Sequence, residues 1–507
     1  MATYGFAIDL RKCIGCHACT IACKAEHQIP VGVNRCWVKT VEKGTFPDTR
    51  RQFFPVLCNQ CEDAPCVTIC PTNTLFKRRD GIVDFNHASC IGCRACMEAC
   101  PYDQLFIDPN THTAEKCNFC ANRVENKLQP ACVSVCPTEC RIFGDLDDPA
   151  SEVSQIFQRE AFMVRKPEKG TGPKVLYLGA SESVIRPEAS VRPLYYKEGQ
   201  VHLRPLGAPM PDPESPGDAR VDYDVPHGKP WGIDMVLYLL FKAIGTGAML
   251  LAALLWYLGY DGPLVRLAAP ILSIVFVTLT AVVLIIDLER PERFYYILTR
   301  SNFKSWMVWG AYFLTGHGAL STAWLLAGWF GFSTVLDWLI LPTAIVALMA
   351  TAYTGFLFAQ GLARDLWQGP AAAIDLVAQS GAAGSASLLL ASLLTGTGTP
   401  DAAPLLGLVL ALSVGTHLLI LVFEHILSPS PTRHHELATQ TFLRGAYSRL
   451  FWGGAIGAGG ILPLVLLITL GVTFSSLVTS VAAVLALAGG AAWEYIWVEA
   501  GQSVPLS

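Results

Sequence analysis

The sequence predicts an α+β domain followed by an all-α membrane domain of eight transmembrane helices. All eighteen cysteines lie before residue 141, whereas the long apolar runs lie after about residue 230. Overall, 52% of the residues are hydrophobic and only 15% are charged, against roughly a quarter charged in soluble domains. The net charge of -4 comes without a basic stripe, which argues against nucleic acid as a partner.

Sixteen of the cysteines form four groups of four. The groups are Cys13, Cys16, Cys19 and Cys23; Cys58, Cys61, Cys66 and Cys70; Cys90, Cys93, Cys96 and Cys100; and Cys117, Cys120, Cys132 and Cys136. The first and third groups read C-x2-C-x2-C-x3-C, a spacing that fits the ligands of iron–sulfur clusters and fits the paired ligands of structural zinc poorly. Four complete groups therefore predict four [4Fe–4S] clusters.

A proline follows the last cysteine of three groups, at Pro71, Pro101 and Pro137. In the bacterial ferredoxin pattern this last cysteine ligates the other cluster of a pair. Short turns and strands are expected between the groups, for example at 77–85 and 103–117. Residues 1–180 are therefore interpreted as a ferredoxin-like electron-transfer domain with two ferredoxin-type units.

The segments CIGCHACTIAC, CNQCEDAPCVTICP, CIGCRACMEACP and CNFCANRV…PACVSVCP resemble the four-cluster iron–sulfur subunit of the dimethyl sulfoxide reductase and polysulfide reductase families. The resemblance ends near residue 180. It implies which cysteines share a cluster: Cys13, Cys16, Cys19 and Cys136; Cys117, Cys120, Cys132 and Cys23; Cys58, Cys61, Cys66 and Cys100; and Cys90, Cys93, Cys96 and Cys70. Cys36 and Cys140 match no ligand position and are expected to be small buried hydrophobic residues.

Residues 181–232 are rich in proline, glycine and charge, which predicts an extended linker. Residues 233–507 then hold apolar runs long enough for a hydrocarbon layer of about 30 Å. The predicted spans are 234–258, 264–286, 306–330, 336–360, 372–395, 404–427, 449–470 and 474–496.

Positive charge in the loops predicts the orientation of the membrane domain. The loops on the side of the cysteine domain carry Arg290, Arg293, Arg300, Lys304, Arg364, Arg433, Arg444 and Arg449, and the opposite side offers only Arg266. The residues before Cys13 contain no apolar signal segment and no twin-arginine pair. We therefore expect a multi-pass protein of a bacterial or archaeal cell membrane, with the iron–sulfur domain on the cytoplasmic side.

The second half resembles the membrane subunit of polysulfide reductase, of the NrfD-like family. The segments DLERPERF (287–294), LYLLFKAIGTGA (237–248) and TAYTGFLFA (351–359) carry the resemblance. The two subunits are usually separate chains in this family, whereas here they are fused. The resemblance implies a quinone site close to the iron–sulfur domain, with a tyrosine of the fourth span, here Tyr353, contacting the ring.

Polar residues predicted near the cluster-side leaflet suit such a site, because ionisable residues inside a span commonly mark function. Lys242 and Tyr353 lie at similar depth, and Asp287 lies at the end of the second span, followed by Arg290. We interpret these four as candidate ligands of menaquinone or ubiquinone. The alternatives are that Lys242 snorkels to the interface, that Tyr353 is an interfacial aromatic, and that the arginines of the loop anchor the topology or pair with the cluster domain.

Other ionisable residues lie near span ends. Glu424, at the end of the sixth span, shares the cluster-side leaflet with Lys242, Tyr353 and Asp287. We nevertheless expect the pair Glu424-His425, like Asp375 and Glu494, to be solvated. His317 and His417 lie nearer to mid-membrane, where they suit either a proton path or hydrogen-bonded structural positions.

No nucleophile–base pair, phosphate loop or molybdenum-binding signature is apparent in the sequence. The leading interpretation is an electron-transfer and membrane-anchor subunit of a quinone-linked oxidoreductase complex. By resemblance, a separate subunit with molybdenum or tungsten bound to pterin cofactors would transform the substrate. Sulfite is the favoured substrate, and polysulfide, thiosulfate, tetrathionate, arsenic species or formate are alternatives. The rival interpretations are a proton-translocating module driven by the clusters, and a relay between soluble partners in which the membrane half is merely an anchor.

Overall fold

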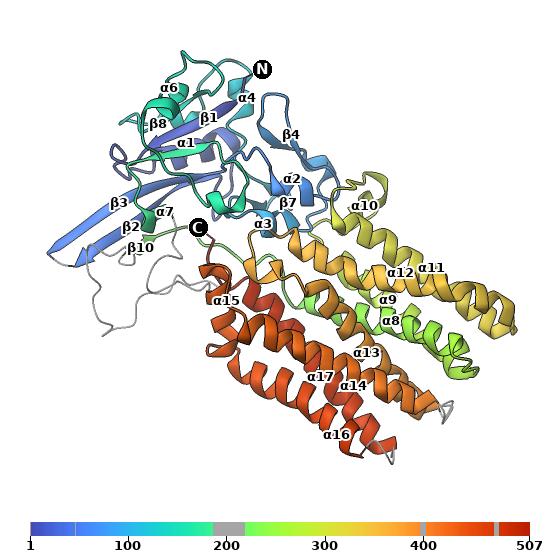
Figure 1. The fold of residues 1–507 in the computed structure, drawn as a ribbon. Helices are drawn as coiled ribbons and strands as arrows, with labels where there is room; N and C mark the ends of the chain where they lie inside the picture. The colour runs from blue at the N-terminus through green and yellow to red at the C-terminus, as the bar shows by residue number, and fades with distance from the viewer. Residues whose placement is uncertain (1, 46, 186–218, 396–401, 471–475, 507) are drawn as a thin grey trace.

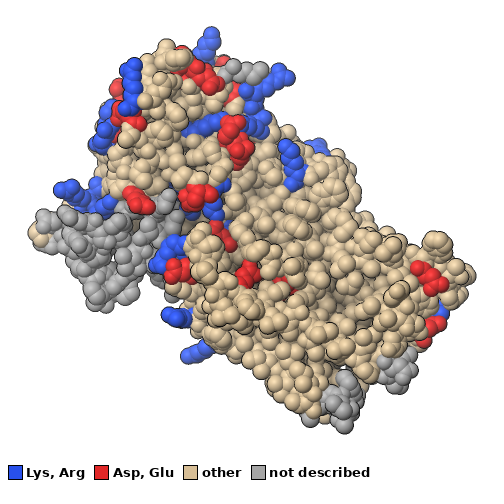
Figure 2. Space-filling model, viewed as in Figure 1, with Lys and Arg blue, Asp and Glu red and all other residues tan. Residues whose placement is uncertain are grey.

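A computed structural model describes residues 2–45, 47–185, 219–395, 402–470 and 476–506. A cysteine-rich α+β domain lies at one end of a bundle of long helices, which run away from it (Figure 1). Charged side chains gather on the α+β domain, whereas the visible side of the helical domain carries few (Figure 2). The predicted succession of an α+β domain and a helical membrane domain is confirmed.

Two three-stranded sheets frame the α+β domain. In one, β1 (Tyr4–Asp9) lies between antiparallel β8 (Arg141–Asp145) and parallel β9 (Val175–Leu178). In the other, β2 (Cys36–Thr45) pairs with β3 (Asp48–Leu57) and with β10 (Ala219–Tyr223). Both sheets therefore join segments that are distant in sequence.

The described part of this domain also contains two small hairpins and seven short α-helices. The hairpins are β4 (Leu75–Lys77) with β5 (Val83–Phe85), and β6 (Phe106–Asp108) with β7 (Thr113–Glu115). The helices are α1 (Ala18–His27), α2 (Pro65–Ile69), α3 (Ala95–Ala99), α4 (Ala121–Val124), α5 (Ala131–Ser134), α6 (Glu152–Arg159) and α7 (Glu182–Ile185). Five of them, α1 to α5, overlap the cysteine groups.

The segment interpreted as a linker (181–232) contains ordered structure at both ends. Helix α7 contributes buried Val184 and Ile185 to the core of the α+β domain. Strand β10 extends the β2–β3 sheet, so this part of the segment lies along the first domain. Residues 186–218 of the predicted linker lie outside the described residues.

The helical domain contains a helix at each of the eight predicted positions. These are α8 (Ile233–Tyr257), α9 (Ala269–Ile286), α11 (Trp306–Phe330), α12 (Ser333–Ala359), α13 (Ala372–Thr395), α14 (Ala402–Leu421), α16 (Leu462–Leu470) and α17 (Ser476–Gly501). The π-helical segments Leu264–Ala268, Val422–Leu427 and Leu450–Ile461 extend α9, α14 and α16, respectively. Among the described residues, seven helices are long and apolar enough to cross a membrane. Helix α11, rich in glycine, tryptophan and hydroxyl side chains, is not one of the seven, so the eighth span stays a prediction.

Small residues allow close packing in this bundle. A Cβ atom on Gly384 of α13 would collide with the backbone of Gly247 in α8. The small-residue segment SGAAGSAS, which interrupts the fifth predicted span, therefore lets the backbones of α8 and α13 approach closely.

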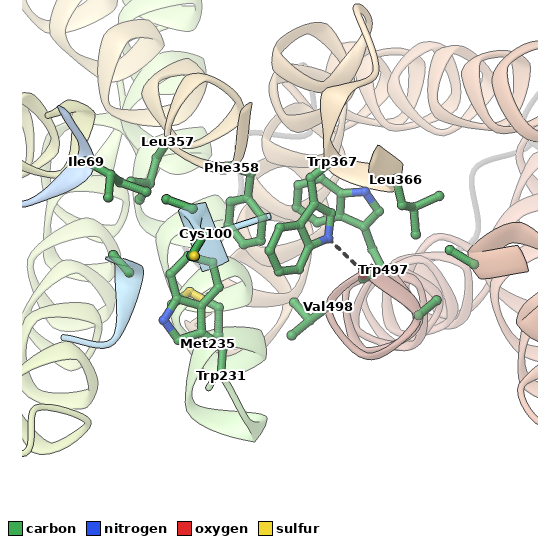
Figure 3. Close-up of a cluster of buried hydrophobic side chains, with 14 of the residues drawn as sticks. Ile69, Cys100, Trp231, Met235, Leu357, Phe358, Leu366, Trp367, Trp497 and Val498 are labelled. Carbon is green, nitrogen blue, oxygen red and sulfur yellow. Dashed lines mark hydrogen bonds between the residues drawn. The ribbon is translucent and has the colours of Figure 1, made fainter. Parts of the chain in front are cut away.

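The two domains share one continuous hydrophobic core. Ile69 and Cys100 of the α+β domain lie beside Leu357 and Phe358 of the membrane domain and beside Trp231, just before α8 (Figure 3). A second group of aromatic rings continues this core, because Trp367 stacks near Trp231 and donates a hydrogen bond from Nε1 to the carbonyl of Trp497 at 3.1 Å. The junction is thus packed like a protein interior.

Candidate functional site

The structure brings together the cysteines of each set expected from the family pattern. Cys13, Cys16, Cys19 and Cys136 line one small cavity, which Cys140 lines as well. Burial raises the pKa of three further thiols, each of which has the other members of its set as electrostatic neighbours. These are Cys66 with Cys58, Cys100 and Cys61; Cys96 with Cys93, Cys90 and Cys70; and Cys117 with Cys23, Cys120 and Cys132.

These sixteen soft sulfur donors fit iron–sulfur clusters, which cysteine thiolates hold. When bound, such clusters carry single electrons. Backbone geometry supports the cysteine loops. Gly92, between Cys90 and Cys93, has a φ of 71°, a conformation that side-chain-bearing residues rarely adopt. A Cβ atom there would also collide with Glu289 of the membrane domain.

Cys36 and Cys140 are buried, 2% and 3% exposed, as expected for small hydrophobic residues. Their surroundings are nevertheless polar. Arg141, also buried, donates a hydrogen bond from Nη2 to the Cys36 sulfur at 3.1 Å, and the Cys140 sulfur lies 3.5 Å from that of Cys136.

The set formed by Cys90, Cys93, Cys96 and Cys70 lies directly against the membrane domain. Asn302 donates from Nδ2 to the carbonyl of Cys70 at 2.8 Å. Arg293 donates to the carbonyl of Cys90 at 3.0 Å, and the Trp231 indole donates to that of Cys93 at 3.4 Å. Side chains of the membrane domain, and of Trp231 just before α8, therefore hold the backbone of three of these four cysteines.

Asp287 and Arg290, two of the candidate quinone ligands, both contact the iron–sulfur domain, and Arg290 also pairs with neighbouring Glu292. Asp287 pairs with Arg94, which lies between Cys93 and Cys96, and its carbonyl accepts a hydrogen bond from Arg94 Nη2 at 2.7 Å. Arg290 donates from Nε to the carbonyl of Thr111 at 2.9 Å. Their quinone role stays a prediction.

Lys242 and Tyr353, the other two candidates, belong to one buried network between α8 and α12. The Tyr353 hydroxyl lies 2.5 Å from the Tyr238 hydroxyl, which lies 2.7 Å from Thr354 Oγ1. Lys242 Nζ donates to Thr354 Oγ1 and, at 3.3 Å, to the carbonyl of Thr351. Lys242 is 1% exposed and Tyr353 is 4% exposed, so neither reaches the bundle surface as a snorkelling or interfacial residue would.

Sequence reasoning missed Tyr238, although the signal was available. Tyr238 precedes Lys242 by four residues in α8, and residues at this spacing lie on one helix face. Its aromatic side chain resembles the neighbouring apolar residues in a hydropathy profile, which hides the hydroxyl.

The expectation that the ionisable residues near span ends are solvated is wrong for three of them. Asp375 is 7% exposed, Glu494 is 3% exposed and His425 is 7% exposed. They line a cavity between α13, α14 and α17, together with half-buried Glu424. The cause is tertiary packing, because these helix ends are covered by each other and by the junction with the iron–sulfur domain.

The two histidines predicted near mid-membrane occupy different networks. His417 Nδ1 lies 2.6 Å from Asp375 Oδ1, and His417 lines a second cavity that shares Gln379 and Glu494 with the one just described. His317 is fully buried, and its Nε2 lies 3.0 Å from the hydroxyl of Ser273. Ser273 also contacts Ser321, at 3.0 Å.

Together, the cysteine sets and the apolar helices define a multi-pass membrane protein with a fused iron–sulfur domain. Residues 224–505 match the family described as polysulphide reductase, NrfD, and residues 49–146 match the 4Fe-4S dicluster domain. The protein belongs to the NrfD polysulphide reductase family, in a form that carries its iron–sulfur domain on the same polypeptide. The resemblance expected from the sequence is thus confirmed.

The first part of the protein is similar to separate subunits of several reductases. It is 44% identical over 188 residues to a tetrathionate reductase subunit from Salmonella typhimurium, covering 36% of this protein and 75% of the relative. It is 42% identical over 177 residues to one of the polypeptides of polysulfide reductase from Wolinella succinogenes, covering 34% and 92%. It is 37% identical over 222 residues to the arsenate respiratory reductase iron–sulfur subunit from a Shewanella species, covering 34% and 95%. These relatives support a role in a redox complex.

Proposed function

We propose that this protein is the electron-transfer and membrane-anchor subunit of a quinone-linked molybdopterin oxidoreductase complex. One observation carries the proposal. On one side of the domain junction, membrane-domain side chains donate hydrogen bonds to the backbone of the cysteine set that includes Cys70 and Cys90. On the other side, within the membrane domain, lies the hydrogen-bond network of Tyr353 and Lys242. Cys70 and Cys90 of the cysteine set and Tyr353 of the network belong to the same buried hydrophobic core. Four [4Fe–4S] clusters would carry the electrons.

The network of Tyr353 and Lys242 suits a quinone headgroup. A quinone has two carbonyl oxygens that accept hydrogen bonds and take up protons on reduction. A phenol and an ammonium group donate such bonds, and burial strengthens them because the surrounding dielectric is low. Asp287 and Arg290 would act beside this site at the domain junction. Menaquinone and ubiquinone both have the required carbonyls.

The opposite end of the cysteine domain suits a catalytic partner. The cavity lined by Cys13 and Cys16 opens beside Ile14, which is 58% exposed, and Ile21 of α1 is 64% exposed. Exposed apolar side chains near a redox centre favour docking of another protein. A subunit with molybdenum or tungsten bound to pterin cofactors would dock here. Sulfite is the favoured substrate, and the names of the relatives keep tetrathionate, polysulfide and arsenate as alternatives, with thiosulfate and formate.

An even number of membrane crossings is supported by the two ends of the helical domain. Helix α8 begins at the iron–sulfur domain, and the carbonyls of Val504 and Leu506, beyond α17, accept hydrogen bonds from Arg364 and Arg165. Seven crossings would put the two ends of the helical domain on opposite sides of the membrane. Because both ends lie at the iron–sulfur domain, α11 would be the eighth crossing. The loop charges favour a cytoplasmic iron–sulfur domain in a bacterial or archaeal membrane.

A second candidate function is proton translocation driven by electron transfer. His317 supports it, because this buried histidine and its partners Ser273 and Ser321 form a polar site separate from the network of Lys242. Replacement of His317 and His417 together would abolish proton translocation and leave quinone chemistry intact if this function holds.

The experiment for the leading proposal uses the full-length protein in detergent. The clusters are reduced chemically, and their reoxidation by a short-chain menaquinone is followed by visible absorbance. Rapid reoxidation that a quinone-analogue inhibitor blocks is expected. Reoxidation that is insensitive to the inhibitor would contradict the quinone role and favour a relay between soluble partners. Co-purification from the native membrane tests the partner, because a large molybdopterin protein is expected.

A further inference from the structure

Three carboxylates and two histidines from three membrane-domain segments line two adjoining internal cavities, which together form one polar space. The space lies between α13, α14 with the π-helical turn Val422–Leu427 that follows it, and α17. The ionisable side chains from these segments are Asp375, His417, Glu424, His425 and Glu494. Lys242 of α8 is the neighbouring cation. The ring of His435, in α15 (Arg433–Leu443), stacks on that of His425 with 6.2 Å between the ring centres. Ionisable residues within a membrane domain are costly and commonly mark proton or ion pathways.

Several polar atoms in this space are buried and have no hydrogen-bond partner among the residues that the structure describes. They are Glu494 Oε2, Gln379 Oε1 and His425 Nδ1, on residues that are 3%, 8% and 7% exposed. Buried polar atoms in proteins normally have partners, and internal water often supplies them. Two adjoining cavities share Gln379 and Glu494, and they leave about 20 Å³ and 30 Å³ for water centres. Each is large enough for at least one water molecule, which needs about 10–15 Å³ by this measure.

One end of this polar space meets the network of Tyr353. Glu494 is the electrostatic neighbour of Lys242. Lys242 donates a hydrogen bond to the Thr354 hydroxyl, which is hydrogen-bonded to the Tyr238 hydroxyl. The Tyr238 hydroxyl is in turn hydrogen-bonded to that of Tyr353. Each of these hydrogen bonds is short enough for direct proton transfer.

The other end reaches the side of the iron–sulfur domain. Asp375 accepts a hydrogen bond from Gln379 Nε2 at 2.8 Å and pairs with His417 at 2.6 Å. Half-buried Glu424, whose Oε1 packs against Gly369, is an electrostatic neighbour of Asp375 near the ends of these helices. The polar space therefore extends from the interior of the bundle to its cluster-side surface.

We propose that Glu494 and Asp375 form a proton relay between the Lys242–Tyr353 network and the cluster-side surface at Glu424. The proposal rests on the proposed quinone function. Reduction of a quinone needs two electrons and two protons, and quinol oxidation releases the same. The electrons would pass to or from the cysteine-bound clusters, while each proton passes Lys242, Glu494, cavity water, Asp375 and Glu424. Protons would then exchange on the side of the iron–sulfur domain, by a route distinct from that of the electrons.

The test measures cluster reoxidation by a short-chain menaquinone in the full-length protein carrying Glu494→Gln or Asp375→Asn. Each variant is expected to slow this reaction about a hundredfold, the scale of a lost proton-transfer group, and to increase the solvent deuterium isotope effect. Reoxidation by ferricyanide, which needs no proton, is expected to stay at the wild-type rate. Glu494→Asp keeps a carboxyl group and is expected to restore most of the rate.

Glu499→Gln is the matched control, because Glu499 lies on the same helix and pairs with Lys229 outside the cavity. It is expected to react with quinone at the wild-type rate. If Glu494→Gln and Asp375→Asn both react with menaquinone at the wild-type rate, the relay is refuted. In that case, slow reaction of Tyr353→Phe with menaquinone would still support the quinone site. If the wild-type protein does not react with menaquinone, the proposed function fails and the relay fails with it. Ferricyanide rates and the electron paramagnetic resonance spectrum of the clusters identify a variant that has lost its fold.

Discussion

Arg364 of the membrane domain and Glu98 of the iron–sulfur domain form an ion pair across the junction, with Nε 2.6 Å from Oε2. The side chains are 4% and 0% exposed. Glu98 lies in α3 between Cys96 and Cys100, so the pair joins a cysteine group directly to the loop that follows α12. A buried charge is costly unless it is paired. The pair therefore favours one arrangement of the two domains.

Removal of one partner should destabilise the junction strongly. We expect Arg364→Met to cost about 3 kcal/mol, because it leaves the Glu98 carboxylate buried without a partner. The double variant Glu98→Gln with Arg364→Met should recover much of this loss. Thermal unfolding followed by cluster absorbance measures both changes. Arg433→Met is the control, since its pair with Glu436 is exposed and should contribute less than about 1 kcal/mol. Equal effects of Arg364→Met and Arg433→Met would contradict the role of the buried pair.

The positions of the helices were predictable because apolar length is a local property of the sequence. The span predicted at 306–330 coincides with α11. The predicted end of a helix was wrong where the helix packs against the other domain and not against lipid. The last span was predicted to end at residue 496, but α17 continues to Gly501 beneath the iron–sulfur domain. Glu494 thus lies farther inside the protein than the hydropathy pattern indicates.

The candidate site was predictable only in part, for a similar reason. Lys242 and Tyr353 were found because polar residues in apolar runs are conspicuous, and the structure places them in one network. Asp287 and Arg290 were equally conspicuous, yet both contact the iron–sulfur domain, at Arg94 and at Thr111. A single sequence does not reveal which polar residues near a span end meet another domain.

The hydroxyl pair of Tyr353 and Tyr238 should be needed for reaction with quinone. We expect Tyr353→Phe to slow cluster reoxidation by menaquinone at least about tenfold, equivalent to about 1.4 kcal/mol, because a donor to the quinone oxygen is lost. Tyr238→Phe should give a smaller decrease, since it removes only the partner of that donor. Stopped-flow absorbance measures both rates. Tyr312→Phe is the matched control, because Tyr312 is 39% exposed on α11. A wild-type rate for Tyr353→Phe would contradict its assignment.

The segment that leads into α8 should loosen as pH rises. Burial lowers the pKa of His227, but the charge of Asp103 and a hydrogen bond to it, 3.0 Å between Nδ1 and Oδ2, outweigh burial and raise the pKa above 6.5. A raised folded-state pKa stabilises the protein fully below about pH 6.5, and this stabilisation is lost as pH rises through the folded-state value.

Hydrogen–deuterium exchange of residues 219–231 at pH 6 and pH 9 tests this expectation, after correction for the intrinsic pH dependence of exchange. Protection should decrease with pH in the wild-type protein. In His227→Gln the dependence should largely disappear, because the neutral amide does not titrate. A variant with the wild-type pH dependence would show that other groups are responsible.

The adjacent thiols Cys136 and Cys140 allow a sharp test of the predicted cluster ligands. Their sulfur atoms lie 3.5 Å apart, but only Cys136 belongs to a predicted set, with Cys13, Cys16 and Cys19. The wild-type protein should contain about sixteen iron atoms per polypeptide, four for each complete set of cysteines. Cys136→Ser should lower the iron content by up to about four atoms, whereas Cys140→Ser should leave it unchanged. Iron analysis of the purified full-length proteins measures the difference. Because both positions share the same surroundings, loss of iron from Cys140→Ser and not from Cys136→Ser would reverse the assignment, and equal loss from both would indicate that the cluster tolerates neither change near this loop.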